Sequence, residues 1–121
     1  GSMLMNLGTV ASVGREQPKN LTVVVWDNEK WGQTGGQTSH TGTGTDLEKV
    51  AQSCGIARTK TVTDLEDLEA AVSEALSSPD GPHFIVAKVE ETGYLSVAPV
   101  EPEFTLYRFR NTFVEPRQPG D

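Results

Sequence analysis

The sequence predicts an α/β protein in three layers, in which a parallel sheet has helices on both faces. The first observation is that helical and strand patterns alternate along the chain as α–β–loop–α–β–α–β, the order typical of parallel sheets. The second is that the runs at 21–26 and 83–89 are almost wholly apolar, as strands buried on both faces are. The third is that 121 residues with 36% hydrophobic content suit one globular domain.

The first half of the chain predicts a helix, a strand and a long loop. Ser2 can cap a helix over 3–13 that ends at Gly14. Its expected inward face consists of Met3, Leu4, Leu7, Val10 and Ala11. A buried strand follows at 21–26. Residues 27–45 are polar and glycine-rich without apolar periodicity, and such a long loop is uncommon in a compact domain unless it is functional.

The second half predicts two helices and two strands. Thr45 with Glu48, and Thr63 with Glu66, form capping boxes that open helices over 46–54 and from 63 to about 76. Gly55 ends the first of these helices. Strands are expected at 58–62 and 83–89. The expected inward residues are Leu47, Val50, Ala51 and Cys54 in the first helix and Leu65, Leu68, Ala71, Val72, Ala75 and Leu76 in the second.

The remaining sequence, 99–121, is predicted to be a C-terminal tail. It can hold a short helix over 104–114 with Leu106, Phe109 and Phe113 turned inward. The chain opens on a helix cap and only three strands follow, which is thin for an independent α/β domain. We therefore expect one partial domain over 1–121 that lacks its first strands, so that the chain is a fragment or another chain completes it.

Composition excludes several classes of function. A formal net charge of −7 argues against a nucleic-acid partner, since phosphate contacts need clustered Lys and Arg. The sequence shows no apolar run near the ~20 residues of a membrane helix and no secretory signal, so no membrane partner is expected. The single cysteine, Cys54, leaves no internal disulfide, cysteine-built zinc site or iron–sulfur cluster. A lone thiol favours a cytoplasmic location, and on an apolar helix face it is expected to be inert.

The segment after the 21–26 strand carries the residue types most suited to chemistry. In open α/β sheets ligands collect at the carboxyl ends of strands. Residues 27–40 combine oxygen ligands, hydroxyls and glycines, the mixture that a diphosphate held through a hard divalent cation needs. The simpler interpretation is that Asp27-Asn28 and Gly35-Gly36 are turn residues.

The start of the chain is a second candidate. Gly1-Ser2 at a helix N-terminus offers N–H groups to an anion. Gly-Ser-Met is also what a cleaved expression tag leaves, and the sequence leaves both interpretations open. His40 is a possible catalytic acid or hydrogen-bond donor to substrate, or a solvated loop histidine. His83 is expected to be structural.

Together these residues resemble a known family. Gly1-Ser2, the following helix, the apolar strand and Asp27-Asn28 are similar to the thiamine diphosphate motif that runs from Gly-Asp-Gly-Ser to Asn-Asn. The run Trp31-Gly32-Gln33-Thr34-Gly35-Gly36-Gln37 resembles the thiamine-binding half of sulfopyruvate and phosphonopyruvate decarboxylases, and the beta subunit of sulfopyruvate decarboxylase most. The similarity covers roughly residues 1–90 and implies the thiamine diphosphate-binding fold.

The resemblance also implies roles for individual residues. Asn28 would ligate Mg²⁺ through its side-chain oxygen, and Lys30 would give its backbone carbonyl to the same ion. Trp31 and Gly32 would lie beside the diphosphate of the cofactor, and Gly1 and Ser2 would donate to it. Asp27 would stand where the motif has its first Asn and need not touch metal. The motif's Asp, another Mg²⁺ ligand, would precede Gly1 and is absent from this sequence, which implies weak cofactor binding by this chain alone.

The implied chemistry is decarboxylation of a small 2-oxo acid, with thiamine diphosphate accepting the electrons. No position matches the family's activating glutamate, since Glu29, Glu48 and Glu66 are a loop neighbour and two capping residues. The resemblance therefore implies a complementary pyrimidine-binding subunit or domain, and an oligomer. Two alternatives stay open: a beta-like subunit of a 2-oxo acid:ferredoxin oxidoreductase, against which the single cysteine counts, and an inactive truncated domain that serves as an assembly piece.

Overall fold

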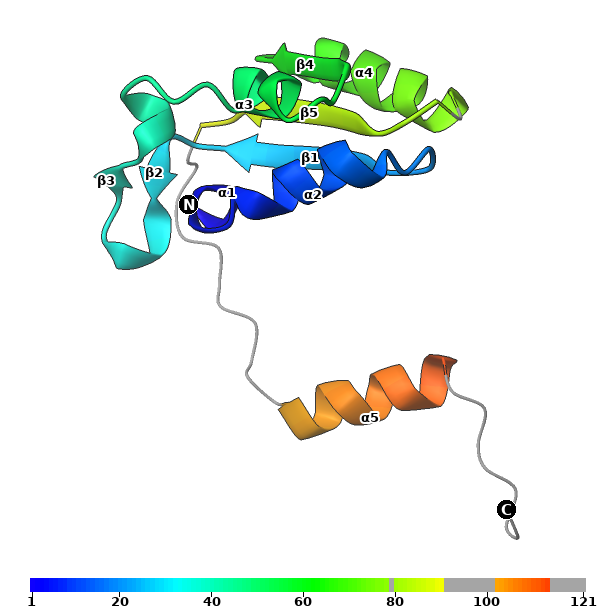
Figure 1. The fold of residues 1–121 in the computed structure, drawn as a ribbon. Coiled ribbons are helices and arrows are strands. Elements are labelled where there is room, and N and C mark those ends of the chain that lie inside the picture. The colour runs from blue at the N-terminus through cyan, green and yellow to red at the C-terminus, as the bar shows by residue number, and fades with distance from the viewer. Residues whose placement is uncertain (79, 91–101, 114–121) are drawn as a thin grey trace, which may run out of the picture. The chain divides into compact units, whose positions relative to one another are not determined.

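The computed structural model of the chain describes residues 1–78, 80–90 and 102–113. It divides into two compact units, Gly1–Glu91 and Thr92–Asp121, drawn in Figure 1. The first unit contains, in order, α1 (Ser2–Met5), α2 (Gly8–Glu16), β1 (Thr22–Asp27), β2 (Lys30–Trp31), η1 (Gly32–Thr34), β3 (Gln37–Thr38), η2 (His40–Gly42), α3 (Leu47–Ser53), β4 (Arg58–Val62), α4 (Leu65–Ser77) and β5 (His83–Lys88). The second contains α5 (Pro102–Phe113).

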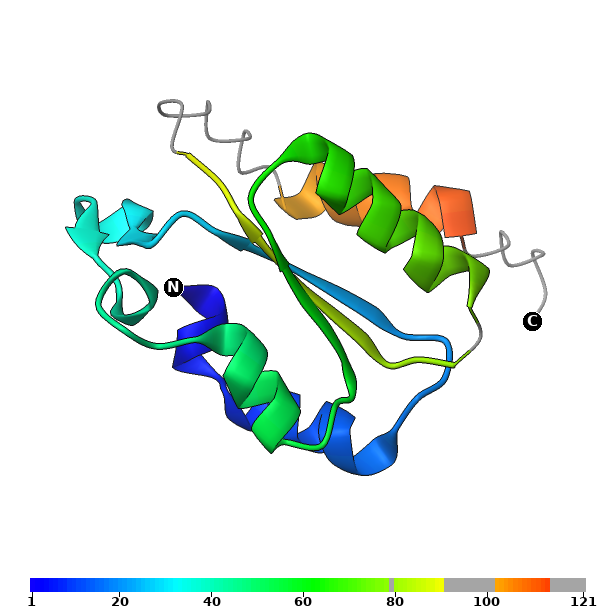
Figure 2. The same ribbon diagram turned by 90° about the horizontal axis from the view of Figure 1, so that it is seen from above.

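The main sheet of the first unit is parallel, as the sequence predicts. Its order is β1-β5-β4, and the central position of β5 is visible in the register, where Ile85 pairs with Val24 on one side and Lys60 on the other. Figure 2 shows α2 and α3 on one face of the sheet and α4 on the other. The predicted α/β class with a three-layer parallel sheet is therefore confirmed.

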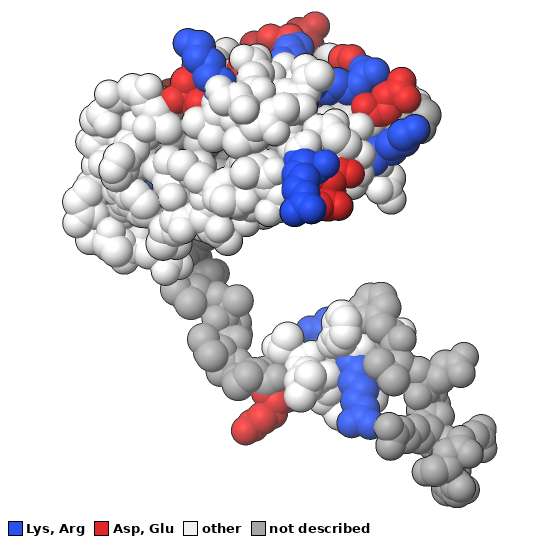
Figure 3. Space-filling view, viewed as in Figure 1, with Lys and Arg blue, Asp and Glu red and all other residues white. Residues whose placement is uncertain are grey.

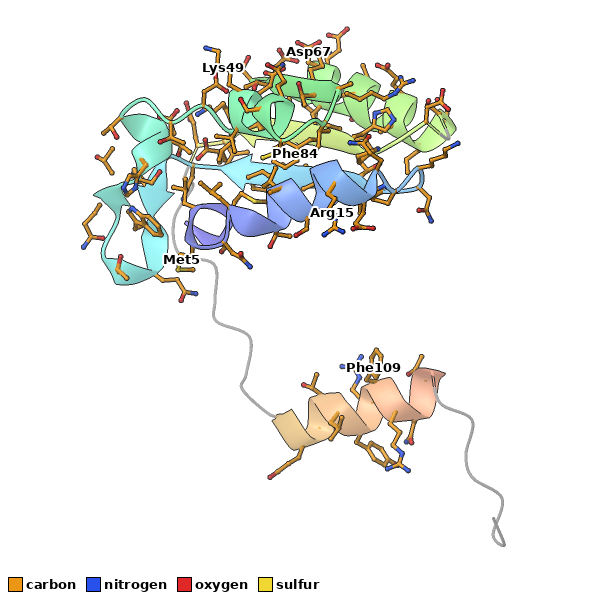
Figure 4. All side chains as sticks on the ribbon, viewed as in Figure 1. Met5, Arg15, Lys49, Asp67, Phe84 and Phe109 are labelled. Atoms are coloured by element: carbon orange, nitrogen blue, oxygen red, sulfur yellow. The ribbon has the colours of Figure 1, made fainter. Side chains whose placement is uncertain are left out.

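The central strand β5 explains how both faces are filled. Its residues alternate between the two faces, as in any strand, and each face has its own apolar cluster. Phe84 and Val86 belong to the cluster with α2 and α3, and Phe84 is the labelled side chain between the sheet and α2 in Figure 4. Ile85 and Ala87 belong to the cluster with α4. The run at 83–89 is apolar because both sets are buried.

Two glycines set the packing of α2 against α3. Gly14, predicted to end the first helix, lies inside α2, which continues to Glu16. A Cβ on Gly14 would stand 1.8 Å from the carbonyl oxygen of Cys54, so the two helices approach closely here only because position 14 has no side chain. Gly55 ends α3 as predicted, with φ +90°, a value that favours glycine.

The predicted helix starts need correction. The helix expected over 3–13 is two helices, because the chain turns at Asn6, where φ is −143°, and Ser2 lies in α1 rather than capping it. The cap of α3 is Asp46, whose carboxylate accepts from the Lys49 amide, and not Thr45. The cap of α4 is Asp64, and not Thr63. In both cases the carboxylate one residue later is the acceptor that faces the free N–H groups of the first turn.

Some residues predicted to be inward are exposed. Trp26 is 63% exposed, Leu65 69% and Leu76 79%, and Ala11 is exposed as well. Trp26 and Leu65 line an open hollow of about 190 Å³ at the carboxyl end of the sheet. The strand β1 is therefore buried on one face more than on the other, and its apolar sequence overstates its burial.

The segment predicted as a loop over 27–45 holds regular structure. The strands β2 and β3 form an antiparallel hairpin with Lys30 opposite Thr38, and η1 and η2 follow each strand. Figure 1 shows this hairpin beyond the carboxyl end of β1, beside the N-terminus of the chain. It lacks apolar periodicity because it packs through hydrogen bonds and glycine turns.

The second unit, taken by itself, contains α5. It extends over Pro102–Phe113, close to the predicted 104–114, and Val114 lies outside the described residues. Leu106 is 68% exposed and Phe109 61%, because one helix of this length has no core of its own in which to bury them. Across the described ranges, no helix has the length and apolarity needed to cross a membrane.

Candidate functional site

The site begins with Asp27, the last residue of β1. Its side chain is 6% exposed and both carboxylate oxygens are bonded. Oδ1 accepts from the Thr41 hydroxyl at 2.7 Å and from the Glu29 amide at 3.1 Å, and Oδ2 accepts from Lys88 Nζ at 2.8 Å. Both oxygens of the Asp27 carboxylate are thus already bonded within the protein.

These contacts shift the pKa values of Asp27 and Lys88. Burial disfavours the charged form of Asp27, but hydrogen bonds from Lys88, Thr41 and the Glu29 amide, with the Lys88 charge, leave the pKa of Asp27 below its ordinary value of 3.8. Partial burial likewise opposes the Lys88 charge, yet hydrogen bonds to Asp27 and Glu29 and their negative charges raise the pKa of Lys88 above 10.5. The pair is charged throughout the neutral range.

The lowered pKa of Asp27 predicts a pH dependence of stability. A carboxylate with a lowered pKa stabilises the fold above its unfolded-state pKa and loses that contribution as pH falls through the folded-state pKa. We expect the free energy of unfolding, measured by urea denaturation, to decrease as pH falls below 3.8, with a smaller decrease in Asp27→Asn. Part of the decrease in unfolding free energy should remain in the variant, because the Lys49 amide also lowers the pKa of Asp46. Equal decreases in the two proteins would contradict the prediction.

The next residues form a tight turn that presents oxygen atoms. The side-chain Oδ1 of Asn28 accepts from the Lys30 amide at 3.1 Å, which makes an Asx turn. Glu29, between them, has φ +58°, an uncommon conformation for a residue other than glycine. An amide oxygen has two lone pairs, so Asn28 Oδ1 can accept this bond and still offer a second electron pair to a cation. The oxygen atoms of this turn are therefore of the type that binds a hard cation.

A second group of predicted site residues meets around Trp31. A Cβ on Gly1 would stand 2.8 Å from the Trp31 ring, so the chain start packs directly on the indole. The His40 ring lies edge-on to Trp31, with 6.1 Å between centroids. Gly32 continues the chain from Trp31 into η1, and Ser2 is the first residue of α1. Trp31 therefore packs against both Gly1 and His40, and Ser2 and Gly32 adjoin this contact as the chain neighbours of Gly1 and Trp31.

The electrostatics of this region suit an anion better than the net charge suggests. The stretches 1–14 and 31–45 contain no Asp, Glu, Lys or Arg. Figure 3 shows the face over α1 and the hairpin almost entirely white, with the charged side chains elsewhere on that face of the molecule. The four residues of α1 supply a smaller dipole than the predicted longer helix, so the attraction for an anion rests on N–H groups.

Charged side chains on β4 and α3 are bonded to partners away from the turn. Arg58 pairs with Asp80 at 3.3 Å and aligns with His83 at the amino end of the strands. Lys60 pairs with Asp67. Glu48, expected as a capping residue, instead accepts from the Thr61 and Thr59 hydroxyls at 2.6 and 3.2 Å. Among the described residues, no three His, Cys, Asp or Glu side chains group as a metal site, which leaves amide and carbonyl oxygens as the candidate ligands.

Comparison with known proteins decides the family. The model of the thiamine pyrophosphate enzyme family, C-terminal TPP binding domain, matches residues 1–87. The chain belongs to this family. The match includes Gly1-Ser2, Asn28 and the hairpin, the residues that carry the resemblance. As a TPP binding domain, the chain has the fold class predicted for it.

Individual relatives show similarity over most of this TPP binding domain. The chain is 37% identical over 109 residues to a sulfopyruvate decarboxylase subunit beta of Methanocaldococcus jannaschii, covering 90% of this chain and 57% of the relative. It is 37% identical over 115 residues to the subunit of that name from Methanococcus maripaludis, covering 92% and 59%. A phosphonopyruvate decarboxylase of Streptomyces viridochromogenes is 41% identical over 85 residues, 70% of this chain and 21% of the relative. The chain spans little more than half the length of the first two relatives.

Sequence analysis missed the residues that hold the turn in this TPP binding domain. Lys88 and Thr41 were not considered, although both bond to Asp27. A signal existed for Lys88: it is a charged residue at the carboxyl end of an apolar strand, which in a parallel sheet lies at the same edge as Asp27. Thr41 had no such signal, since it is one of several threonines in a loop.

Proposed function

We propose that this chain is the cofactor-binding subunit, or part of one, of a thiamine diphosphate-dependent decarboxylase for a 2-oxo acid of the sulfopyruvate or phosphonopyruvate type. The observation that carries the proposal is the Asn28 turn at the carboxyl end of β1, in a chain that matches the TPP binding domain over residues 1–87. The names of the relatives, sulfopyruvate and phosphonopyruvate decarboxylases, support the substrate class.

The proposed site has two parts. Asn28 Oδ1 and the backbone carbonyl of Lys30 would ligate Mg²⁺, an ion that prefers oxygen ligands. Gly1, Ser2, Trp31 and Gly32 would lie around the diphosphate, which is supported by the contact between position 1 and the Trp31 ring. When bound, thiamine diphosphate supplies an electron sink for the carbanion that loss of CO₂ creates.

The chain's own residues would bind and orient. Backbone N–H groups at the start of α1 have no partner within the helix and can donate to phosphate oxygens. His40, exposed and edge-on to Trp31, is proposed as a hydrogen-bond donor or acid toward substrate. Activation of the cofactor would come from a complementary pyrimidine-binding subunit in an oligomer, which the name "subunit beta" of two relatives supports. The lone Cys54 supports a cytoplasmic enzyme.

The test has two stages. Calorimetric titration of the full chain, alone and with a candidate complementary subunit, measures thiamine diphosphate binding with and without Mg²⁺; we expect Mg²⁺-dependent binding. Release of CO₂ is then measured from sulfopyruvate, phosphonopyruvate and pyruvate. Binding without decarboxylation of any of the three would overturn the enzyme assignment. An absence of binding with the complementary subunit present would overturn the cofactor assignment and favour an assembly role.

A further inference from the structure

The Asn28 turn is held from outside by a single lysine. Lys88 Nζ lies 2.8 Å from Asp27 Oδ2 and 2.6 Å from Glu29 Oε1, so it bonds the residue before Asn28 and the residue after it. These partners are 61 and 59 positions away in the sequence. The contact therefore exists only because the parallel pairing of β1 with β5 places Asp27 opposite Lys88.

The hairpin holds the turn from its other side. The Asp27 carboxylate accepts from Thr41, and the Thr41 hydroxyl lies 2.7 Å from the Ser39 hydroxyl. The Ser39 amide donates to the Glu29 carbonyl at 2.8 Å. Ser39 and Thr41 are buried, with 1% and 9% exposure. The two neighbours of Asn28 are thus fixed by β5 and by the segment after β3.

The turn needs this support. Glu29 has φ +58°, and a left-handed conformation costs a non-glycine residue free energy that surrounding contacts must offset. The bonds from Lys88 to Asp27 and Glu29 hold the residues on either side of Asn28, one of which is the strained Glu29. Without them the Glu29 backbone is held in the left-handed region only by the Ser39 amide and by the turn's own bonds, so Asn28 Oδ1 and the Lys30 carbonyl are less firmly oriented.

We propose that Lys88 is a positioning residue that fixes the Asn28–Lys30 turn for ligation, acting through Asp27 and Glu29. The ligation half of the proposal rests on the proposed function, whereas the geometric half does not. The Lys88–Glu29 pair, with side chains 31% and 48% exposed, adds little to global stability. The Lys88–Asp27 pair involves a carboxylate that is only 6% exposed, so its loss also destabilises the fold. The local effect on the turn must therefore be measured against a reporter of the whole sheet.

The experiment compares Lys88→Met and Lys88→Arg in the full chain. Lys60→Met is the matched control, because Lys60 is also a strand lysine in an ion pair, with Asp67. Two quantities are measured: hydrogen exchange of the Lys30 and Ser39 amides in the chain without cofactor, and the Mg²⁺-dependent Kd for thiamine diphosphate with the complementary subunit. Exchange at Ile85, in the middle of β5, reports general loosening.

The expected result is a loss of protection at the Lys30 and Ser39 amides in Lys88→Met that is clearly larger than any loss at Ile85. The Kd should rise about tenfold or more, the cost typical of losing a residue that orients a metal ligand. Lys88→Arg should retain most of the amide protection and most of the cofactor affinity. Lys60→Met should change neither quantity. Unchanged protection in Lys88→Met, or an equal effect in Lys60→Met, would overturn the proposal. If the unaltered chain binds no cofactor, the proposed function fails, and the amide measurements alone decide whether Lys88 holds the turn.

Discussion

Replacing Asn28 with alanine is expected to weaken Mg²⁺-dependent binding of thiamine diphosphate by about 100-fold or more, at or above the upper end of the ~10–100-fold cost of losing an outer partner of a metal ligand. The substitution removes the side-chain oxygen proposed to ligate the ion. It also removes the bond that this oxygen accepts from the Lys30 amide, so the second proposed ligand loses its support. Calorimetric titration with the complementary subunit present measures the change.

Two variants separate ligation from general damage at position 28. Asn28→Asp keeps an oxygen that can both accept the Lys30 amide bond and bind Mg²⁺, and it should retain cofactor affinity within roughly tenfold, since carboxylates are common Mg²⁺ ligands. Asn20→Ala removes an exposed asparagine in the turn before β1 and should leave affinity unchanged. If Asn28→Ala bound the cofactor as well as Asn20→Ala does, Asn28 would not be a ligand.

Replacing Gly14 with alanine is expected to destabilise the fold by about 3 kcal/mol, the upper part of the usual range for overpacking. In an open helix the same change stabilises by up to about 1 kcal/mol. Here the new Cβ would stand 1.8 Å from the Cys54 carbonyl oxygen, and backbone must move. Gln17 spans this contact, because its side-chain amide donates to the carbonyls of Gly14 and Gly55. Urea denaturation measures the loss.

Gly8 provides the matched control within the same helix. Its added Cβ would meet only the Asn6 side chain, at 3.7 Å, so Gly8→Ala should be neutral or stabilising by up to about 1 kcal/mol. A loss of about 3 kcal/mol is a large part of the ~5–15 kcal/mol that folds have. Similar stabilities for Gly14→Ala and Gly8→Ala would show that α2 and α3 do not approach as closely as described.

The order and type of the main elements could be predicted because apolar runs and helical periodicity are local properties. The runs at 21–26 and 83–89 became the paired strands β1 and β5, each shifted by no more than one residue at either end. The exposure of Trp26 could not be predicted, since a wholly apolar run gives no alternation that tells an inward face from an outward one.

Helix caps were misplaced by one residue for a physical reason. In Thr45-Asp46 and Thr63-Asp64 both neighbours have a side-chain oxygen able to cap a helix. Which one does so depends on where the backbone leaves the extended region, and the preceding loop decides this. In both helices the aspartate accepts the first-turn amide. The break between α1 and α2 at Asn6 could not be predicted either, because Gly8, a residue that weakens helices, stands two positions later and apolar residues continue through both helices.

The position of the candidate site at the sheet edge could be predicted from the sequence, but the hydrogen bonds that shape the turn could not. Asp27-Asn28 after an apolar strand indicated the sheet edge, and the structure places Asn28 at that edge as the acceptor of an Asx turn. The bonds that shape the turn join positions 14 and 61 residues apart. Such contacts depend on the finished sheet and hairpin, so the sequence indicates at most that Lys88 lies at the same sheet edge as Asp27 and not that the two side chains bond.

The hydrogen-bonded connection between the hairpin and the ends of β1 and β5 has a consequence for ligand association. Thr41 and Ser39 bury their hydroxyls against Asp27 and each other, so the segment is ordered as part of folding. Ordering a segment costs about 1–2 kcal/mol per residue in backbone conformational entropy alone. Folding has already compensated this cost before a ligand binds. A ligand that binds at this edge meets a preorganised surface, and more of its contact free energy remains as affinity.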